Sequence, residues 1–235
     1  MRLSGGKVTP VTTTEPGPVA DHDVVEPIAL PALDREDQER FRRVLADAQE
    51  ALREAAVPFA LLGGVASCVY GRPRWTHDID IFVRPHDARN ALGVLADAGF
   101  ETARHDETWI YKAVKDDVLV DVLFKAEGDV YFDDEMAGRS RQVEFEGVAV
   151  TAVAPEDLLI VKVLAHKEET SRYWFDALSI VARSDLDWGY LLRRARIAPA
   201  RVLSLLVYAV SSGMAIPPGP VAQLVAEAFP SPPET

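Results

Sequence analysis

The sequence predicts an α+β protein, in which a mixed sheet flanked by helices is followed by a helical C-terminal part. Between residues 59 and 153, apolar residues alternate or form short runs of strand length, separated by stretches with helical spacing. After Pro155 the apolar spacing is helical to the end of the chain. A chain of 235 residues has the size of one domain, or of a core with a smaller appendage. We therefore expect a core over 34–153 and a helical region over 154–235, preceded by a flexible tail over 1–33.

The N-terminal part combines this tail with a first helix. The first 33 residues contain five prolines and the run Thr12–Thr14, with no periodic apolar pattern, which is typical of a flexible tail. Asp34 suits the N-cap of a helix over 35–56, because apolar residues recur there at spacings of three and four.

The other elements follow from local patterns. A short apolar strand over 59–62 meets Gly63-Gly64 and passes into a helix over 65–70. The rest of the predicted core consists of a strand over 78–83, a helix over 85–98, a loosely alternating segment over 107–114, a strand over 118–124 and a hairpin or bent strand over 142–153. The predicted C-terminal helices cover 155–168, 172–183, 187–196, 200–212 and 220–228.

Composition and charge exclude several classes of protein. Hydrophobic residues make up 48% and charged residues 26% of the chain, which is the balance of a folded globular protein. The longest apolar runs are far shorter than the roughly 18 residues that cross a bilayer, and the first residues lack the apolar segment of a secretion signal. One cysteine and five scattered histidines form neither a disulfide nor a zinc pattern, so we expect a reducing cytoplasmic location and no membrane partner. The net charge of −12 opposes unaided binding to nucleic-acid backbones.

Three aspartates are the candidate catalytic and metal-binding residues. Asp78 and Asp80 stand two apart in a predicted strand, so both side chains project from one face, while the intervening isoleucines face the core. Asp121 is the single charge in the apolar run 118–124, and it joins the pair if that strand lies alongside. Buried carboxylates are costly unless they are paired, protonated or bound to a metal ion, and a site with only oxygen ligands favours Mg²⁺.

A glycine pair predicts a phosphate-binding turn. Gly63-Gly64 precedes a helix that contains Ser67, and free N–H groups at such a helix start point toward an anion. Arg74 is placed to hold phosphate and Thr76 to hydrogen-bond the turn before the acids, although surface roles for both stay open.

These motifs, in this order, resemble the polymerase-beta-type nucleotidyltransferase superfamily, specifically its small bacterial members. The matching segments are F-A-L-L-G-G-V-A-S at 59–67, R-W-T-H-D-I-D-I-F at 74–82, V-L-V-D-V-L-F at 118–124, A-P-E-D-L-L-I-V-K at 154–162 and R-Y-W-F-D-A-L at 172–178. The resemblance covers roughly residues 58–182. Its last two segments resemble those of abortive-infection type (AbiEii-like) toxins, some relatives of which modify tRNA, and less closely those of enzymes that adenylylate antibiotics.

The resemblance implies a nucleotidyltransferase-type fold and the transfer of a nucleotide from an NTP to an acceptor hydroxyl, with release of pyrophosphate. It implies that the three aspartates hold two Mg²⁺ ions, that Gly63 and Gly64 hold the nucleotide phosphates and that Lys162 approaches the nucleotide. The implied acceptor is tRNA or another RNA, a protein or a small molecule, and a toxin member would have an antitoxin protein as its partner. Gly64 stands where many relatives carry serine, so a hydroxyl contact to phosphate is lost there, and whether Ser67 replaces it stays open.

Several alternatives stay open beside this interpretation. Lys162 lies among apolar residues, so it either extends its stem to the surface or reaches a phosphate or carboxylate. Asp176, a further candidate at the nucleotide site, either orients Lys162 or Arg172 or caps local structure. The whole chain could also be a catalytically silent nucleotide- or partner-binding module of the same fold, or a metal-dependent glycosyltransferase, which also uses a D-x-D motif.

A basic cluster in the C-terminal part bears on the acceptor. Its members are Arg193, Arg194, Arg196 and Arg201, and such a cluster invites an RNA contact. Helix-end electrostatics on a solvated face is the favoured interpretation, because arginines often occur there in soluble helices.

Overall fold

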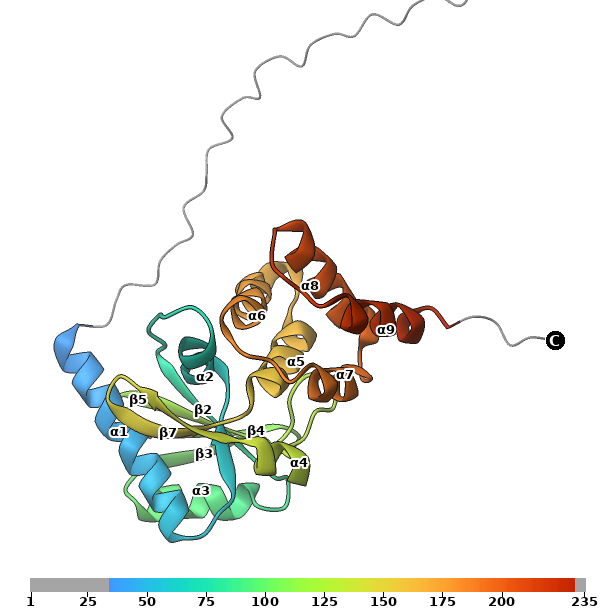
Figure 1. Cartoon of the computed structure of the whole chain (residues 1–235). Helices are drawn as coiled ribbons and strands as arrows, with labels where there is room; N and C mark the ends of the chain where they lie inside the picture. Colours follow the sequence, from blue (N-terminus) through green and yellow to red (C-terminus); the bar gives the residue numbers. More distant parts are fainter. Residues whose placement is uncertain (1–33, 231–235) are drawn as a thin grey trace, which may run out of the picture. The chain divides into compact units, whose positions relative to one another are not determined.

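The computed structural model describes residues 34–230, so the tail predicted over 1–33 lies outside the described residues (Figure 1). The strands are β1 (Phe59–Leu61), β2 (Asp78–Val83), β3 (Glu101–Asp106), β4 (Ile110–Lys115), β5 (Val118–Leu123), β6 (Arg141–Phe145) and β7 (Val148–Ala152). The helices are α1 (Arg35–Glu54), α2 (Gly63–Tyr70), α3 (Ala88–Asp97), α4 (Asp134–Arg139), α5 (Pro155–Ala165), α6 (Arg172–Arg183), α7 (Trp188–Ala195), α8 (Pro199–Ser211) and α9 (Pro218–Ala228), with a 3₁₀ turn at Glu168–Thr170.

The strands form one mixed sheet in the order β3-β4-β5-β2-β1-β7-β6. β2 pairs with β5 in parallel, and β1 pairs with β7 in parallel, whereas the other neighbours are antiparallel. Together with the helices that follow β7, this confirms the predicted α+β class.

Helices cover both faces of the sheet (Figure 1). On one face α1 and α3 pack with Ile79 and Ile81 of β2 in a single apolar cluster. On the other face, Phe82 of the same strand packs in a second cluster with the C-terminal helices. Because side chains alternate along a strand, Asp78 and Asp80 lie on the same face as Phe82, toward α2, α5 and α6.

The sequence did not predict the strand β3 or the helix α4. β3 has the sequence E-T-A-R-H-D and is almost entirely exposed at the sheet edge, so it carries no apolar alternation that sequence analysis could detect. α4 has only six residues and buries only Met136, which is too short for a helical period. The segment 142–153 forms the hairpin of the two alternatives considered, because Glu146 and Gly147 both have positive φ in a two-residue turn.

Within residues 34–230, no helix is long and apolar enough to cross a membrane. The change from strands to helices falls between β7 and α5, but the division into a core over 34–153 and a separate helical region stays a prediction.

Candidate active site

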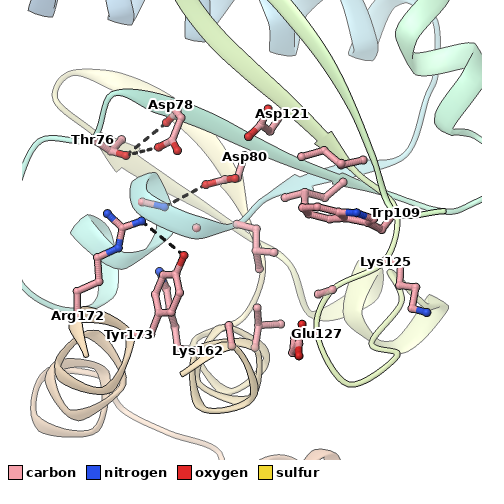
Figure 2. A pocket seen from close by; sticks show the side chains of 18 of the residues that line it. Thr76, Asp78, Asp80, Trp109, Asp121, Lys125, Glu127, Lys162, Arg172 and Tyr173 are labelled. Atoms are coloured by element: carbon pink, nitrogen blue, oxygen red, sulfur yellow. Dashed lines mark hydrogen bonds between the residues drawn. The ribbon is translucent and has the colours of Figure 1, made fainter. Parts of the chain in front are cut away.

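A cleft of about 490 Å³ lies between the sheet on one side and the helices α5 and α6 on the other (Figure 2). Its sheet side carries the three candidate acids, and the N-terminus of α2 forms part of the same wall. Lys162 of α5 and the first residues of α6 line the facing side. Pockets of this size hold small molecules of nucleotide size.

The structure brings Asp78, Asp80 and Asp121 together. β2 and β5 are adjacent parallel strands, and their register places Asp80 directly beside Asp121. Each carboxylate offers an oxygen that lies within 4.8 Å of those offered by the other two. The expected convergence therefore follows from two features, the two-residue spacing within β2 and the pairing of β2 with β5.

Each acid also accepts one hydrogen bond from the protein. The Thr76 hydroxyl donates to Asp78 Oδ1 at 2.6 Å, and the Gly64 N–H donates to Asp80 Oδ2 at 3.4 Å. The Lys112 ammonium lies 2.7 Å from Asp121 Oδ1. Of the two roles left open for Thr76, the structure shows the hydrogen bond before the acids, and this bond orients Asp78.

The crowding of the acids shows in the electrostatics of Asp80. Burial, followed by the like charges of Asp78 and Asp121, raises the pKa of Asp80 to about 7. Lys162 and the Gly64 N–H act in the opposite direction without cancelling this rise. A carboxyl in this state favours either a proton or a metal cation.

We expect the stability of the metal-free protein to fall between about pH 4 and pH 7. The folded protein keeps the Asp80 proton up to about pH 7, whereas the unfolded chain loses it near 3.8, so this stabilisation is complete below pH 3.8 and is lost as the pH rises. The slope is at most about 1.4 kcal/mol per pH unit. Urea unfolding in EDTA from pH 5 to 8 measures it, and Asp80→Asn, which cannot titrate, should lack this part of the slope. Equal slopes in the two proteins would contradict the prediction.

Both glycines lie so close to neighbouring side chains, Asp80 and Thr76, that a larger residue would not fit. Gly63 begins α2 with φ of +53°, and a Cβ there would lie 1.7 Å from Asp80 Oδ2. A Cβ at Gly64 would lie 2.2 Å from the Thr76 hydroxyl oxygen. The Thr76 side chain therefore occupies the space that a serine at position 64 would need, which explains the departure from the family pattern.

Ser67, a candidate nucleotide-binding residue whose phosphate contact the sequence left open, does not line the cleft. Its hydroxyl is buried and donates to the Gly63 carbonyl at 2.6 Å, one turn earlier in α2. A serine bonded within its own helix is not aimed at a ligand.

A buried ion-pair group supports the helix side of the cleft. Asp176 Oδ2 lies 3.2 Å from the Lys162 ammonium and 2.9 Å from the Arg74 guanidinium. Lys162 is only 4% exposed, so its stem does not extend to the surface. Burial alone would raise the pKa of Asp176, but Lys162 and Arg74 together hold it below its usual value. Asp176 thus orients Lys162, one of the alternatives predicted, and it also holds Arg74, which the sequence analysis assigned to phosphate.

Several further residues line the cleft that the sequence did not assign to the site, and three of them carry large polar or aromatic side chains on its two walls. Arg172 and Tyr173 open α6, and Trp109 lies on the opposite wall in the β3–β4 turn (Figure 2). The Arg172 guanidinium contacts the Tyr173 hydroxyl at 3.5 Å and lies over the Tyr173 ring. It therefore adds a positive charge to the wall of the cleft that faces the acids.

Three of the four C-terminal arginines make contacts within the fold. Arg193 pairs with Glu135, Arg194 pairs with Asp133 and Asp157, and the Arg201 guanidinium donates to carbonyls at the end of α5. This agrees with the favoured interpretation, helix-end electrostatics, and it gives no support to an RNA contact at these arginines.

The cleft fits a divalent cation. Three carboxylates offer oxygens within 4.8 Å of one another, and burial, followed by the like charges of the other two acids, raises the pKa of Asp80. An oxygen-only ligand set suits Mg²⁺, which commonly combines a few carboxylates with substrate phosphates.

The acids on adjacent strands, beside a helix that starts with glycine, lie within the part of the chain that a family model matches. This model, described as an uncharacterised nucleotidyltransferase, matches residues 33–211. The chain belongs to this family.

Solved structures share part of this fold at low identity. An antigenic nucleotidyltransferase-like protein from Paracoccidioides brasiliensis is 18% identical over 80% of this chain and 93% of its own, with a TM-score of 0.49. The antibiotic-resistance factor ANT(2'')-Ia is 13% identical over 74% of this chain and 96% of its own, with a TM-score of 0.48. The lincosamide antibiotic adenylyltransferase LnuA is 13% identical over 63% of this chain and 97% of its own, with a TM-score of 0.42. No curated protein matches the chain at a significant level.

Proposed function

We propose that this protein is a Mg²⁺-dependent nucleotidyltransferase that moves a nucleoside monophosphate from an NTP to an acceptor hydroxyl. The observation that carries this proposal is the convergence of Asp78, Asp80 and Asp121 in one cleft, beside the glycine start of α2. In the reaction the acceptor oxygen bonds to the α-phosphorus, the bond to pyrophosphate breaks, and the hydroxyl proton is released.

The residues of the cleft divide these tasks. Asp78, Asp80 and Asp121 would hold Mg²⁺, which supplies activation of the hydroxyl and stabilisation of charge on the phosphates. Gly63 and Gly64 form the N-terminus of α2 in the cleft wall, where the positive end of the helix dipole would favour the triphosphate. Lys162 and Arg172 supply positive charge on the facing wall, with Asp176 and Arg74 positioning Lys162.

Labelling with α-³²P-NTPs tests this function. Each of the four NTPs is incubated with Mg²⁺ and total RNA, small hydroxyl compounds or the protein alone. Transfer of label by the wild-type protein supports the proposal if Asp80→Asn transfers no label to any of the acceptors tested. Mg-NTP binding in calorimetry without any transfer would instead indicate a silent binding module. A separate incubation with nucleotide sugars labelled in the sugar tests the glycosyltransferase, in which the sugar moves to the acceptor and the nucleoside diphosphate leaves.

The toxin role expected from the resemblance needs a separate test. Induced expression in a bacterial host that lacks the neighbouring genes should arrest growth for the wild-type protein and not for Asp80→Asn. Normal growth with both proteins contradicts a toxin function and favours a small-molecule acceptor.

We place the acceptor on the Trp109 side of the cleft. In an in-line displacement the attacking oxygen approaches opposite the leaving pyrophosphate, and Trp109 and Arg172 lie on opposite sides of the cleft, with the acids along a third side (Figure 2). The indole is 41% exposed, yet its Nε1 is fixed by a 3.0 Å hydrogen bond to Asp106. A fixed, exposed aromatic ring is a stacking surface for a planar group.

Replacing Trp109 with leucine is expected to raise KM for the acceptor about tenfold, because a stacked ring contributes about 1–3 kcal/mol. Trp109→Phe should keep most of the affinity, and KM for the NTP should change in neither variant. Steady-state kinetics with the acceptor found by labelling measures this. A rise in KM for the NTP in place of the acceptor would show that Trp109 binds the nucleotide base instead.

A further inference from the structure

A lysine ammonium lies inside the acid cluster. Lys112 of β4 is directly opposite Asp121 in the antiparallel register of β4 and β5. Its Nζ lies 2.7 Å from Asp121 Oδ1, and both side chains are largely shielded from solvent. This pair connects the sheet to the proposed metal site.

The hydrogen bonds leave one oxygen of each acid for a ligand. Asp78 Oδ1 is bonded by Thr76, Asp80 Oδ2 by the Gly64 N–H, and Asp121 Oδ1 by Lys112. The second oxygen of each carboxylate accepts no hydrogen bond from the residues that the structure describes. Each acid therefore keeps one oxygen that an ion shared by the three could use, whereas an ion that needs both oxygens of Asp121 would have to displace the bond from Lys112.

The charges of the acids and Lys112 also indicate one bound ion. Three ionised carboxylates carry three negative charges, one divalent cation carries two positive charges, and the Lys112 ammonium carries one. One ion therefore neutralises the group formed by the three acids and Lys112, whereas two ions would leave that group with two excess positive charges.

We propose that Lys112 takes the place of a second metal ion, so that the nucleotide-free protein binds one divalent cation between Asp78, Asp80 and Asp121. This inference rests on the metal binding in the proposed function, and it revises the expectation of two resident Mg²⁺ ions.

Calorimetric titration of the nucleotide-free protein with Mn²⁺ and Mg²⁺ tests the inference without an activity assay. The wild-type protein is expected to bind one ion. Lys112→Met should bind the ion at least tenfold more tightly, because a like charge close to the site is removed and Asp121 gains a free oxygen. A purely structural role for Lys112 predicts the opposite sign, since a loosened Asp121 would bind the ion more weakly.

Two variants control for charge and folding. Lys112→Arg keeps the positive charge and should bind the ion with wild-type affinity. Lys115→Met removes the same charge from the same strand, but at a residue paired with Asp47 outside the cleft, and should change nothing. Thermal unfolding in EDTA verifies that each variant is folded.

Two outcomes overturn the inference. One is two bound ions per wild-type chain without nucleotide, a result that requires no variant. The other is unchanged or weaker binding by folded Lys112→Met. Failure of the proposed function looks different, because it appears as absent nucleotide transfer while one ion still binds, and absence of any ion binding by the wild-type protein overturns both proposals.

Discussion

Replacing Gly63 with alanine is expected to abolish nucleotide transfer while the protein stays folded. The added Cβ would lie 1.7 Å from Asp80 Oδ2, so either Asp80 or the start of α2 must move. Metal-dependent stabilisation of a phosphoryl transition state is worth several kcal/mol, and losing about 4 kcal/mol lowers the rate about 10³-fold. The labelling assay and calorimetric titration with Mg²⁺ measure the two consequences.

Gly99→Ala is the matched control for backbone strain. Gly63 and Gly99 both have positive φ, +53° and +85°. The backbone strain of alanine therefore costs about 1 kcal/mol of stability at either position, apart from the clash with Asp80 at Gly63. A Cβ at Gly99 meets no atom within 4 Å, and the residue lies after α3, outside the cleft. Gly99→Ala should therefore keep transfer within about twofold. Wild-type Mg²⁺ affinity in Gly63→Ala would show that Asp80 does not need its present position.

The acids of the site are predictable from sequence because strand periodicity is simple. The two-residue spacing of Asp78 and Asp80 places them on one face, and the isolated acid Asp121 marks a strand that needs a polar neighbour. Ser67 misleads because its spacing from Gly63 also suits a hydrogen bond to a carbonyl one turn earlier, and that local bond forms.

The pairing of Lys112 with Asp121 could have been predicted from the sequence. Asp116 and Asp117 both have positive φ and form the two-residue turn of the β4–β5 hairpin. Counting outward from this turn pairs Lys115 with Val118 and then Lys112 with Asp121. The turn at Asp116-Asp117 was visible, but the register that follows from it also requires both arms to be strands.

The opposite walls of the cleft could not be predicted in this way. Trp109 reaches the cleft from a turn after the edge strand β3, whose exposed sequence gives no periodic signal. Arg172 reaches it from the first turn of α6, and its place depends on how α6 packs against α5. Both positions follow from tertiary packing, so spacing along the chain carries no information about them.

Replacing Asp176 with asparagine is expected to lower the free energy of unfolding by about 3 kcal/mol or more. Asp176 and Lys162 are almost completely buried, and removing one partner of a buried ion pair leaves the other charge uncompensated. Urea denaturation measures the effect. Glu50→Gln is the control, because Glu50 pairs with Arg53 at the same short distance of 2.9 Å that separates Asp176 from Arg74, but in solvent. An exposed pair of this kind contributes at most about 1 kcal/mol.

Removing the second charge separates stability from function. In Asp176→Asn combined with Lys162→Met, the buried ammonium is gone, so we expect much of the lost stability to return. Transfer should not return, because Lys162 also supplies positive charge to the cleft in the proposed reaction. A double variant no more stable than Asp176→Asn would show that Arg74, and not Lys162, is the partner that makes Asp176 important for folding.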